Sequence, residues 1–130
     1  MAKREGNDMD ALLEEWKQRL GLGEWVIVLY DNVSPMDMES QSATGEVNYD
    51  ELHKCASICI IDKKYYGKRL IPMDKEKTLV HELLHIKFWF LDKSESLLQN
   101  RMVHNLIDEM AVALVETKRS GVNGKIDDAK

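Results

Sequence analysis

The chain has 130 residues, of which 44% are hydrophobic and 32% charged, and its formal net charge at pH 7 is −5. This predicts one globular domain, residues 1–130, and argues against a general nucleic-acid-binding protein, which needs a basic surface. No apolar run is long enough to cross a membrane and the N-terminus does not resemble a secretory signal, so we expect a cytoplasmic protein.

The N-terminal part predicts a helix and then a strand. Residues 1–8 are charged, and we expect a loose tail there. A helix is predicted from Asp8 or Asp10 to Leu20, because its apolar residues recur at helical spacing. The β-branched and aromatic residues over 24–31 predict a buried strand.

A hairpin is predicted next. Residues 32–42 are polar and predict a loop, whereas 42–50 and 54–62 predict two strands joined by a short turn. Such a short connection is typical of an antiparallel hairpin. Cys55 and Cys59 lie four residues apart in the second strand, too far for a disulfide, so we expect reduced, buried thiols.

Two further helices follow a basic loop over 63–73. Asp74 is suited to cap a helix that runs to Leu91, and residues 92–95 predict a turn.

The last helix is predicted to begin at Ser94 or Ser96 and to end near Lys118, with a loose tail over 120–130. The order of elements predicts an α+β domain with a small, largely antiparallel three-stranded sheet packed on helices.

The segment LVHELLHI (79–86) contains the pattern H-E-x-x-H. On a helix, His81 and His85 lie about 40° apart on one face, where two imidazoles can bind one tetrahedral Zn²⁺. Glu82 lies beside them and could take a proton from a zinc-activated water. The surrounding helix is apolar on several sides, which predicts burial, and buried polar groups need partners. The motif therefore predicts a catalytic zinc site.

A third protein ligand is expected for catalytic zinc. The metzincin extension would need glycine at 88 and histidine at 91, but the chain has Phe88 and Leu91. The remaining candidates all lie on the last predicted helix and are His104, Asp108, Glu109 and Glu116.

Helical phase separates these four candidates. At about 100° per residue, Glu109 falls on the edge of the apolar stripe, whereas His104 and Asp108 point away from it. We therefore predict Glu109 as the third ligand, with Glu116 and His104 as alternatives. With angles counted from Leu98, the stripe consists of Met102, Val103, Leu106, Ile107, Met110, Ala113 and Leu114.

A motif helix followed by a helix that carries a glutamate, LIDEMAVAL (106–114), resembles the gluzincin metallopeptidases. The order of elements is similar to that of small SprT-like and phage-associated metallopeptidases, and ImmA/IrrE-type proteases have a similar arrangement. The resemblance covers roughly residues 24–118, and only HELLH is highly specific. In SprT-like proteases the third ligand is a histidine soon after the motif, which this chain lacks.

The resemblance implies a zincin-like hydrolase with one Zn²⁺ on His81, His85 and Glu109, and with Glu82 as general base. It also implies a peptide or protein substrate, which the strand ASICIID (56–62) would meet along its edge. The alternative is a zinc-binding regulatory module without turnover, which a fourth protein ligand would favour.

Other polar residues could stabilise an oxyanion. These candidates are Tyr65, Tyr66, His53, Arg101 and His104. The basic stretch KKYYGKR (63–69) leaves a nucleic-acid-binding accessory protein as a third hypothesis.

Overall fold

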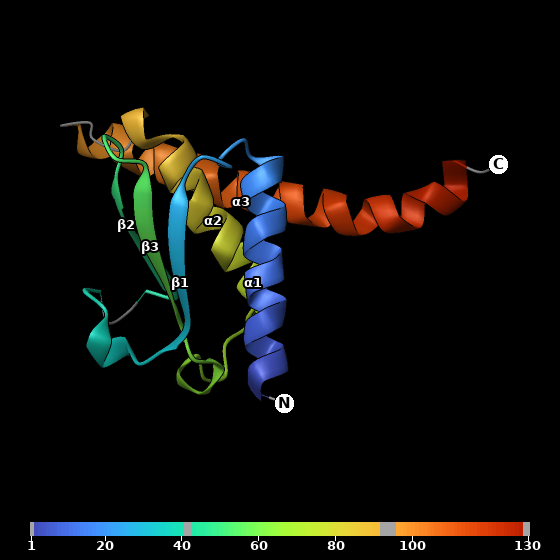
Figure 1. The fold of residues 1–130 in the computed structure, drawn as a ribbon, viewed down its shortest axis with the longest axis horizontal. Coiled ribbons are helices and arrows are strands. Elements are labelled where there is room, and N and C mark those ends of the chain that lie inside the picture. The colour runs from blue at the N-terminus through green and yellow to red at the C-terminus, as the bar shows by residue number, and fades with distance from the viewer. Residues whose placement is uncertain (1, 41–42, 92–95, 129–130) are drawn as a thin grey trace.

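The computed structural model describes the backbone of residues 2–40, 43–91 and 96–128, and the side chains of 8–40, 43–91 and 96–121. This part of the chain forms three helices and a three-stranded sheet, so the predicted α+β class is confirmed (Figure 1). None of the described helices combines the length and apolar character that a membrane span requires. The elements are α1 (Ala2–Arg19), β1 (Val26–Val33), β2 (Gly45–Asp50), β3 (Cys55–Ile61), α2 (Lys75–Lys87) and α3 (Leu97–Asp128).

The sheet is mixed rather than largely antiparallel. Its strand order is β1-β3-β2, with β2 antiparallel to β3 as the hairpin predicted, but with β1 parallel to β3. β3 takes the centre of the sheet, and its Ile58 and Ile60 are fully buried. β3 is thus paired on both sides and has no free edge for a substrate. The outer strand next to α2 is β2.

Helix boundaries differ from the predicted ones in three places. α1 begins at Ala2 and α3 continues to Asp128, so both helices extend into the segments that we predicted as loose tails. α2 begins after its predicted cap, where Asp74 Oδ1 accepts a hydrogen bond from Lys77 N at 3.1 Å. It ends at Lys87, before a short 3-10 turn. The predicted turn over 92–95 lies outside the described residues, as does Ser94.

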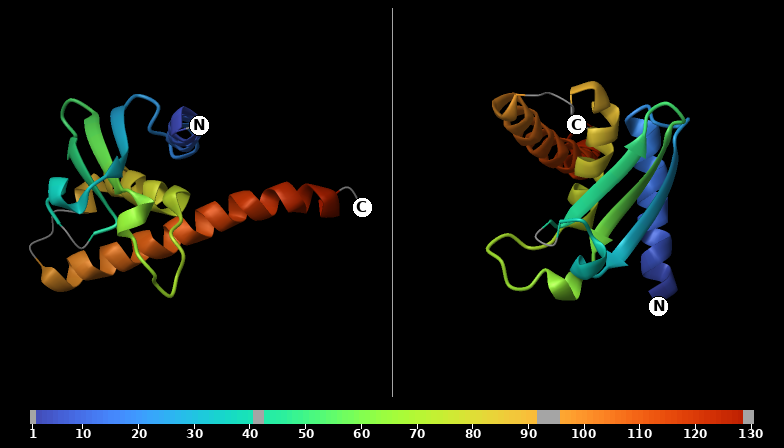
Figure 2. Two further views of the ribbon diagram at one scale, coloured as in Figure 1. Left: turned by 90° about the horizontal axis from the view of Figure 1, so that it is seen from below. Right: turned by 90° about the vertical axis from the view of Figure 1, so that its left-hand side faces the viewer.

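Helix α2 lies at the centre of the packing. It contacts β2 and β3 on one side and α3 on the other, while α1 lies beside β1 and also touches α2 (Figure 2). The sequence of this helix is apolar on several sides, which predicted burial between layers, and the structure shows that burial. The core residues of α2 are Leu79, Val80, Leu83, Leu84 and Ile86, and they meet Trp16, Ile58, Ile60, Ile107, Ala111 and Val115.

The other face of the sheet is open. The β1 strand alternates between half-buried and exposed positions, with Val28 and Tyr30 exposed, so it is not the buried strand that was predicted. Cys55 is also exposed and Cys59 half-buried, and both are free thiols. The prediction that they are buried is wrong because both side chains lie on this uncovered face, at register positions Val26↔Cys55 and Tyr30↔Cys59.

A buried carboxylate ties the three helices together. Glu76, in the first turn of α2, accepts hydrogen bonds from Trp16 Nε1 at 2.7 Å, Lys118 Nζ at 2.6 Å and Arg119 Nη2 at 3.1 Å. Arg119 also reaches both carboxylate oxygens of Asp74. Burial by itself would raise the pKa of Glu76, but the hydrogen bonds from Lys118, Trp16 and Arg119 lower the pKa below its ordinary value. The folded state therefore favours the ionised form.

Replacing Glu76 with glutamine should lower the free energy of unfolding at pH 7 by about 2–4 kcal/mol, because two cations lose a buried partner. A carboxyl whose pKa is depressed by folding stabilises the protein above its unfolded pKa of about 4.3 and loses this effect as pH falls through the folded pKa. Urea unfolding should therefore show a difference at pH 7 that shrinks below about pH 4.

The control is Glu14→Gln. The Glu14 side chain is exposed, and its ion pair with Lys17 Nζ is long at 3.7 Å. We expect it to change stability by less than about 0.5 kcal/mol. Equal unfolding midpoints for both variants at pH 7 would contradict a stabilising role for Glu76.

Candidate metal centre

Helix α2 carries two half-buried histidines one turn apart. Neither belongs to the core cluster of α2: His81 lines a cleft with residues of β2 and α3, and His85 lies beside His104 of α3. Their Nε2 atoms lie 3.2 Å apart, and their ring centroids are 4.9 Å apart. The spacing of the HELLH motif thus places two imidazoles side by side, as the sequence predicted.

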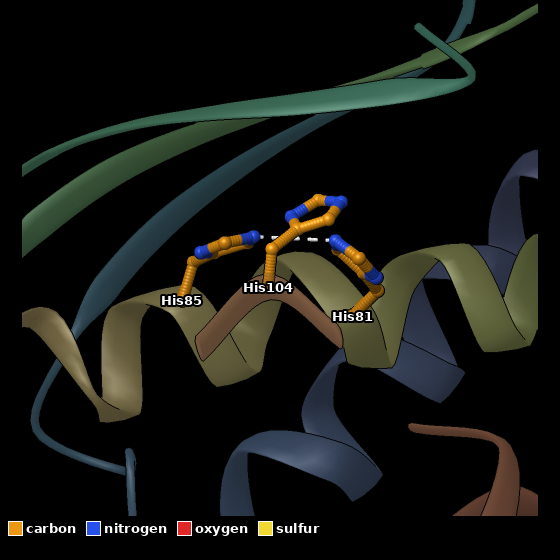
Figure 3. A group of neighbouring side chains, drawn as sticks. All are labelled: His81, His85 and His104. Carbon is orange, nitrogen blue, oxygen red and sulfur yellow. Dashed lines mark hydrogen bonds between the residues drawn. The ribbon is translucent and has the colours of Figure 1, made fainter. Parts of the chain in front are cut away.

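A third imidazole joins them from α3. The ring centroid of His104 lies 5.0 Å from that of His81 and 5.6 Å from that of His85 (Figure 3). One ligand nitrogen from each of the three residues lies within 4.8 Å of the other two. Figure 3 shows the three rings gathered between α2 and the strands. When the histidine, cysteine and acidic side chains of the described residues are considered together, these three histidines are the group that could hold a metal ion.

Asp108 fixes the orientation of one of these imidazoles. Its Oδ1 lies 2.6 Å from His81 Nδ1, so the carboxylate can accept the Nδ1–H and leave Nε2 directed at the other two histidines. Burial is the largest cause of a lowered pKa of His81; Asp108 acts in the opposite direction, and His85 and His104 reinforce the lowering. The neutral imidazole that results is the form that binds metal.

Glu82 completes the site from the next position of α2. It is only 6% exposed and lines a cleft of about 340 Å³ together with His81, His104 and Asp108. The opposite wall is the start of β2, including Gly45. A Cβ atom at Gly45 would lie 2.7 Å from Thr78 Cγ2 and 3.2 Å from Glu82 Oε2. The absence of a side chain at Gly45 therefore lets the strand approach the carboxylate closely.

His104 replaces Glu109 as the candidate third ligand. Glu109 is exposed, as His104 is, but it neither lines the cleft nor belongs to the histidine group. Of the alternatives, Glu116 pairs with Lys77 Nζ at 3.0 Å, whereas His104 is in the group.

The two candidate ligands differ because the phase of α3 differs from the predicted one. The buried side chains of the described part of this helix are Ile107, Ala111 and Val115. The predicted stripe instead took Leu98 as its reference, and Leu98 is 66% exposed. At about 100° per residue, His104 lies about 60° from Ile107, whereas Glu109 lies about 160° away. The exposed apolar residues Leu98, Met102 and Leu106 had shifted the predicted buried face.

The other polar candidates lie away from the cleft. His53 pairs with Asp50 in the β2–β3 turn, with 2.7 Å between Nδ1 and Oδ2. Tyr66 donates its hydroxyl hydrogen to Ile71 O within the basic loop. None of His53, Tyr65, Tyr66 and Arg101 lines the cleft.

Comparison with known protein families, with curated proteins and with solved structures found no match to this chain.

Proposed function

We propose that the chain is a zinc-dependent peptidase in which His81, His85 and His104 hold one zinc ion and Glu82 acts as general base. The observation that carries this proposal is a group of three imidazoles, two of which line one cleft together with the buried carboxylate of Glu82. A histidine in place of a glutamate as third ligand separates the site from gluzincins. We therefore keep a zincin-like fold as part of the proposal, without the gluzincin assignment.

The donor set fits zinc. Zinc takes histidine nitrogens at about 2.0–2.1 Å in tetrahedral geometry, which separates the ligand nitrogens by about 3.4 Å. The Nε2 atoms of His81 and His85 lie 3.2 Å apart. The carboxylate of Asp108 on the far nitrogen of His81 is the outer partner that metal-binding histidines usually have.

Three ligands favour a catalytic site over a structural one. Structural zinc is closed by four protein ligands, whereas catalytic zinc keeps one position open. The group formed by the described side chains has three members and no fourth. This favours the peptidase over the regulatory module without turnover.

The chemistry follows from the two kinds of group in the cleft. A zinc ion bound there would supply a Lewis acid that polarises a carbonyl and acidifies water. Glu82 takes a proton from the attacking water and delivers it to the departing amine, as a general base and then a general acid. Because the Glu82 carboxylate is buried beside His81, little bulk water competes for that proton.

The shape of the cleft supports an extended peptide as substrate. β2 is an outer strand of the sheet, and its first residue, Gly45, lines the cleft. An outer strand offers unpaired backbone groups, and an extended peptide can add to it as a further strand. We place this activity in the cytoplasm, because the free thiols of Cys55 and Cys59 suit a reducing compartment.

The test is digestion of a mixed-sequence peptide library by the zinc-loaded protein. Mass spectrometry should detect new peptide termini, which a chelator should abolish and added zinc should restore. Absence of cleavage by protein with stoichiometric zinc, or cleavage that resists the chelator, would overturn the proposed function.

Asp108→Asn should weaken zinc binding by about 10-fold to 100-fold, because His81 loses the carboxylate that orients it. Equilibrium competition with a chromogenic chelator measures this change. The matched control is Asp10→Asn, since Asp10 is exposed on α1, and its affinity should equal that of the wild type. Equal affinities for the wild type and Asp108→Asn would show that the contact with His81 does not support the metal.

A further inference from the structure

The basic loop between β3 and α2 collects unpaired positive charge. Residues 63–73 contain four cationic side chains and no acidic one, in a chain of net charge −5. None of the four, Lys63, Lys64, Lys68 and Arg69, forms a salt bridge with any described residue. By contrast, most other described cationic side chains pair with a carboxylate. These are Lys17, Arg19, Lys54, Lys75, Lys77, Lys118 and Arg119.

The same loop turns two large apolar side chains outward. Leu70 is 100% exposed and Ile71 72% exposed. The loop nevertheless has internal bonds that shape it, because Tyr66 Oη donates to Ile71 O at 2.7 Å and Arg69 stacks over the Tyr66 ring at 4.2 Å. Exposed aliphatic residues beside unpaired cations, on a loop with its own internal contacts, are typical of an interaction surface.

The loop adjoins the cleft through the chain itself. It leads directly into Asp74, the cap of α2, and the first turns of that helix carry Lys77 and Thr78, which line the cleft. Figure 2 shows the loop projecting from the end of the domain at which α2 begins. A peptide that extends out of the cleft past Lys77 would therefore reach the loop within a few residues.

We propose that the loop over 63–73 binds an acidic segment of the polypeptide substrate, away from the peptide bond that is cleaved. This inference rests on the proposed peptidase function. Four unpaired cations complement a short run of carboxylates, and Leu70 and Ile71 complement apolar residues interspersed among them. A long polyanion fits less well, because the cleft beyond the loop carries the carboxylates of Glu82 and Asp108.

A binding experiment can test this loop without turnover. The probe is a fluorescent peptide that alternates glutamate with leucine, compared with the same peptide carrying glutamine in place of glutamate. The protein is the zinc-loaded Glu82→Gln variant, which should leave the probe intact. Fluorescence anisotropy at low salt should show binding of the acidic peptide only, weakened as salt is raised because exposed charges are screened.

Two double variants with the same change of charge give a matched comparison. Lys64→Gln with Lys68→Gln removes two loop cations and keeps the stacking of Arg69 on Tyr66. Lys87→Gln with Arg101→Gln removes two exposed cations elsewhere. We expect the loop pair to weaken binding about tenfold, from the loss of about 0.7 kcal/mol per cation, and the control pair to change it less than about twofold.

Equal weakening in both pairs, or no binding of the acidic peptide at low salt, would overturn the inference. It would also be overturned if vesicles with anionic lipid or single-stranded DNA bound more tightly than the peptide and depended on the same loop cations. If binding survives but the peptide library is not cleaved by the wild type, the proposed function fails, and the loop is a binding site for acidic peptides that are not substrates. If cleavage survives and binding is absent, only the loop assignment fails.

Discussion

Replacing His104 with alanine should weaken zinc binding by about 100-fold or more, because one of three imidazole ligands is lost from the site. The wild type should bind one zinc ion per chain, and chelator competition measures both affinities. Since the ion binds the folded state, zinc at about 100 times its dissociation constant should stabilise the wild type by about 2.7 kcal/mol. His104→Ala should keep at most about 0.4 kcal/mol of this stabilisation at the same concentration of zinc.

Glu109→Ala is the control that separates the two candidate ligands. Glu109 is exposed on α3 and outside the histidine group, so its loss should leave zinc affinity unchanged within about twofold. The opposite result, with zinc lost in Glu109→Ala and kept in His104→Ala, would restore the ligand chosen by helical phase. Far-UV circular dichroism of the metal-free variants checks that both fold.

Glu82→Gln should lower peptide cleavage about 10²-fold to 10⁴-fold while zinc binding is retained. Glutamine keeps the shape of the side chain but cannot take the proton from water. Cleavage is followed on one peptide taken from the library digest, and zinc content is measured on the same preparation. This separates the role of Glu82 in proton transfer from that of the three histidines.

The matched control is Glu109→Gln, the same chemical change at an exposed position of α3. It should cleave the peptide at the wild-type rate. Undiminished cleavage by Glu82→Gln would show that another group acts as the base. Loss of zinc in Glu82→Gln would instead show that the residue supports the metal site itself.

Features that depend on neighbours in the chain were predictable. The four-residue spacing of His81 and His85 places them on one helical face wherever the helix packs, and Asp74 caps that helix through a local hydrogen bond. The β2–β3 hairpin follows in the same way from its short connection. Each depends on interactions over a few residues, for which local geometry suffices.

Features that depend on distant segments were not predictable in the same way. The direction of β1 is decided by which strand occupies the centre of the sheet, and β1 pairs parallel to β3 across a long connection. The exposure of Cys55 depends on which face of the sheet remains uncovered. Neither property is encoded in the alternation of the strand concerned.

The sequence by itself determined that α2 carries two histidines and a glutamate in a geometry suited to metal chemistry. Only the tertiary structure decided which side chain joins them. The rotation of α3 against α2 is set by the burial of Ile107, Ala111 and Val115, and this turns His104 and Asp108 towards His81 and turns Glu109 to solvent. Apolar residues on the exposed side of α3 make its buried face ambiguous in sequence, because hydrophobic spacing alone does not show which stripe finds a partner.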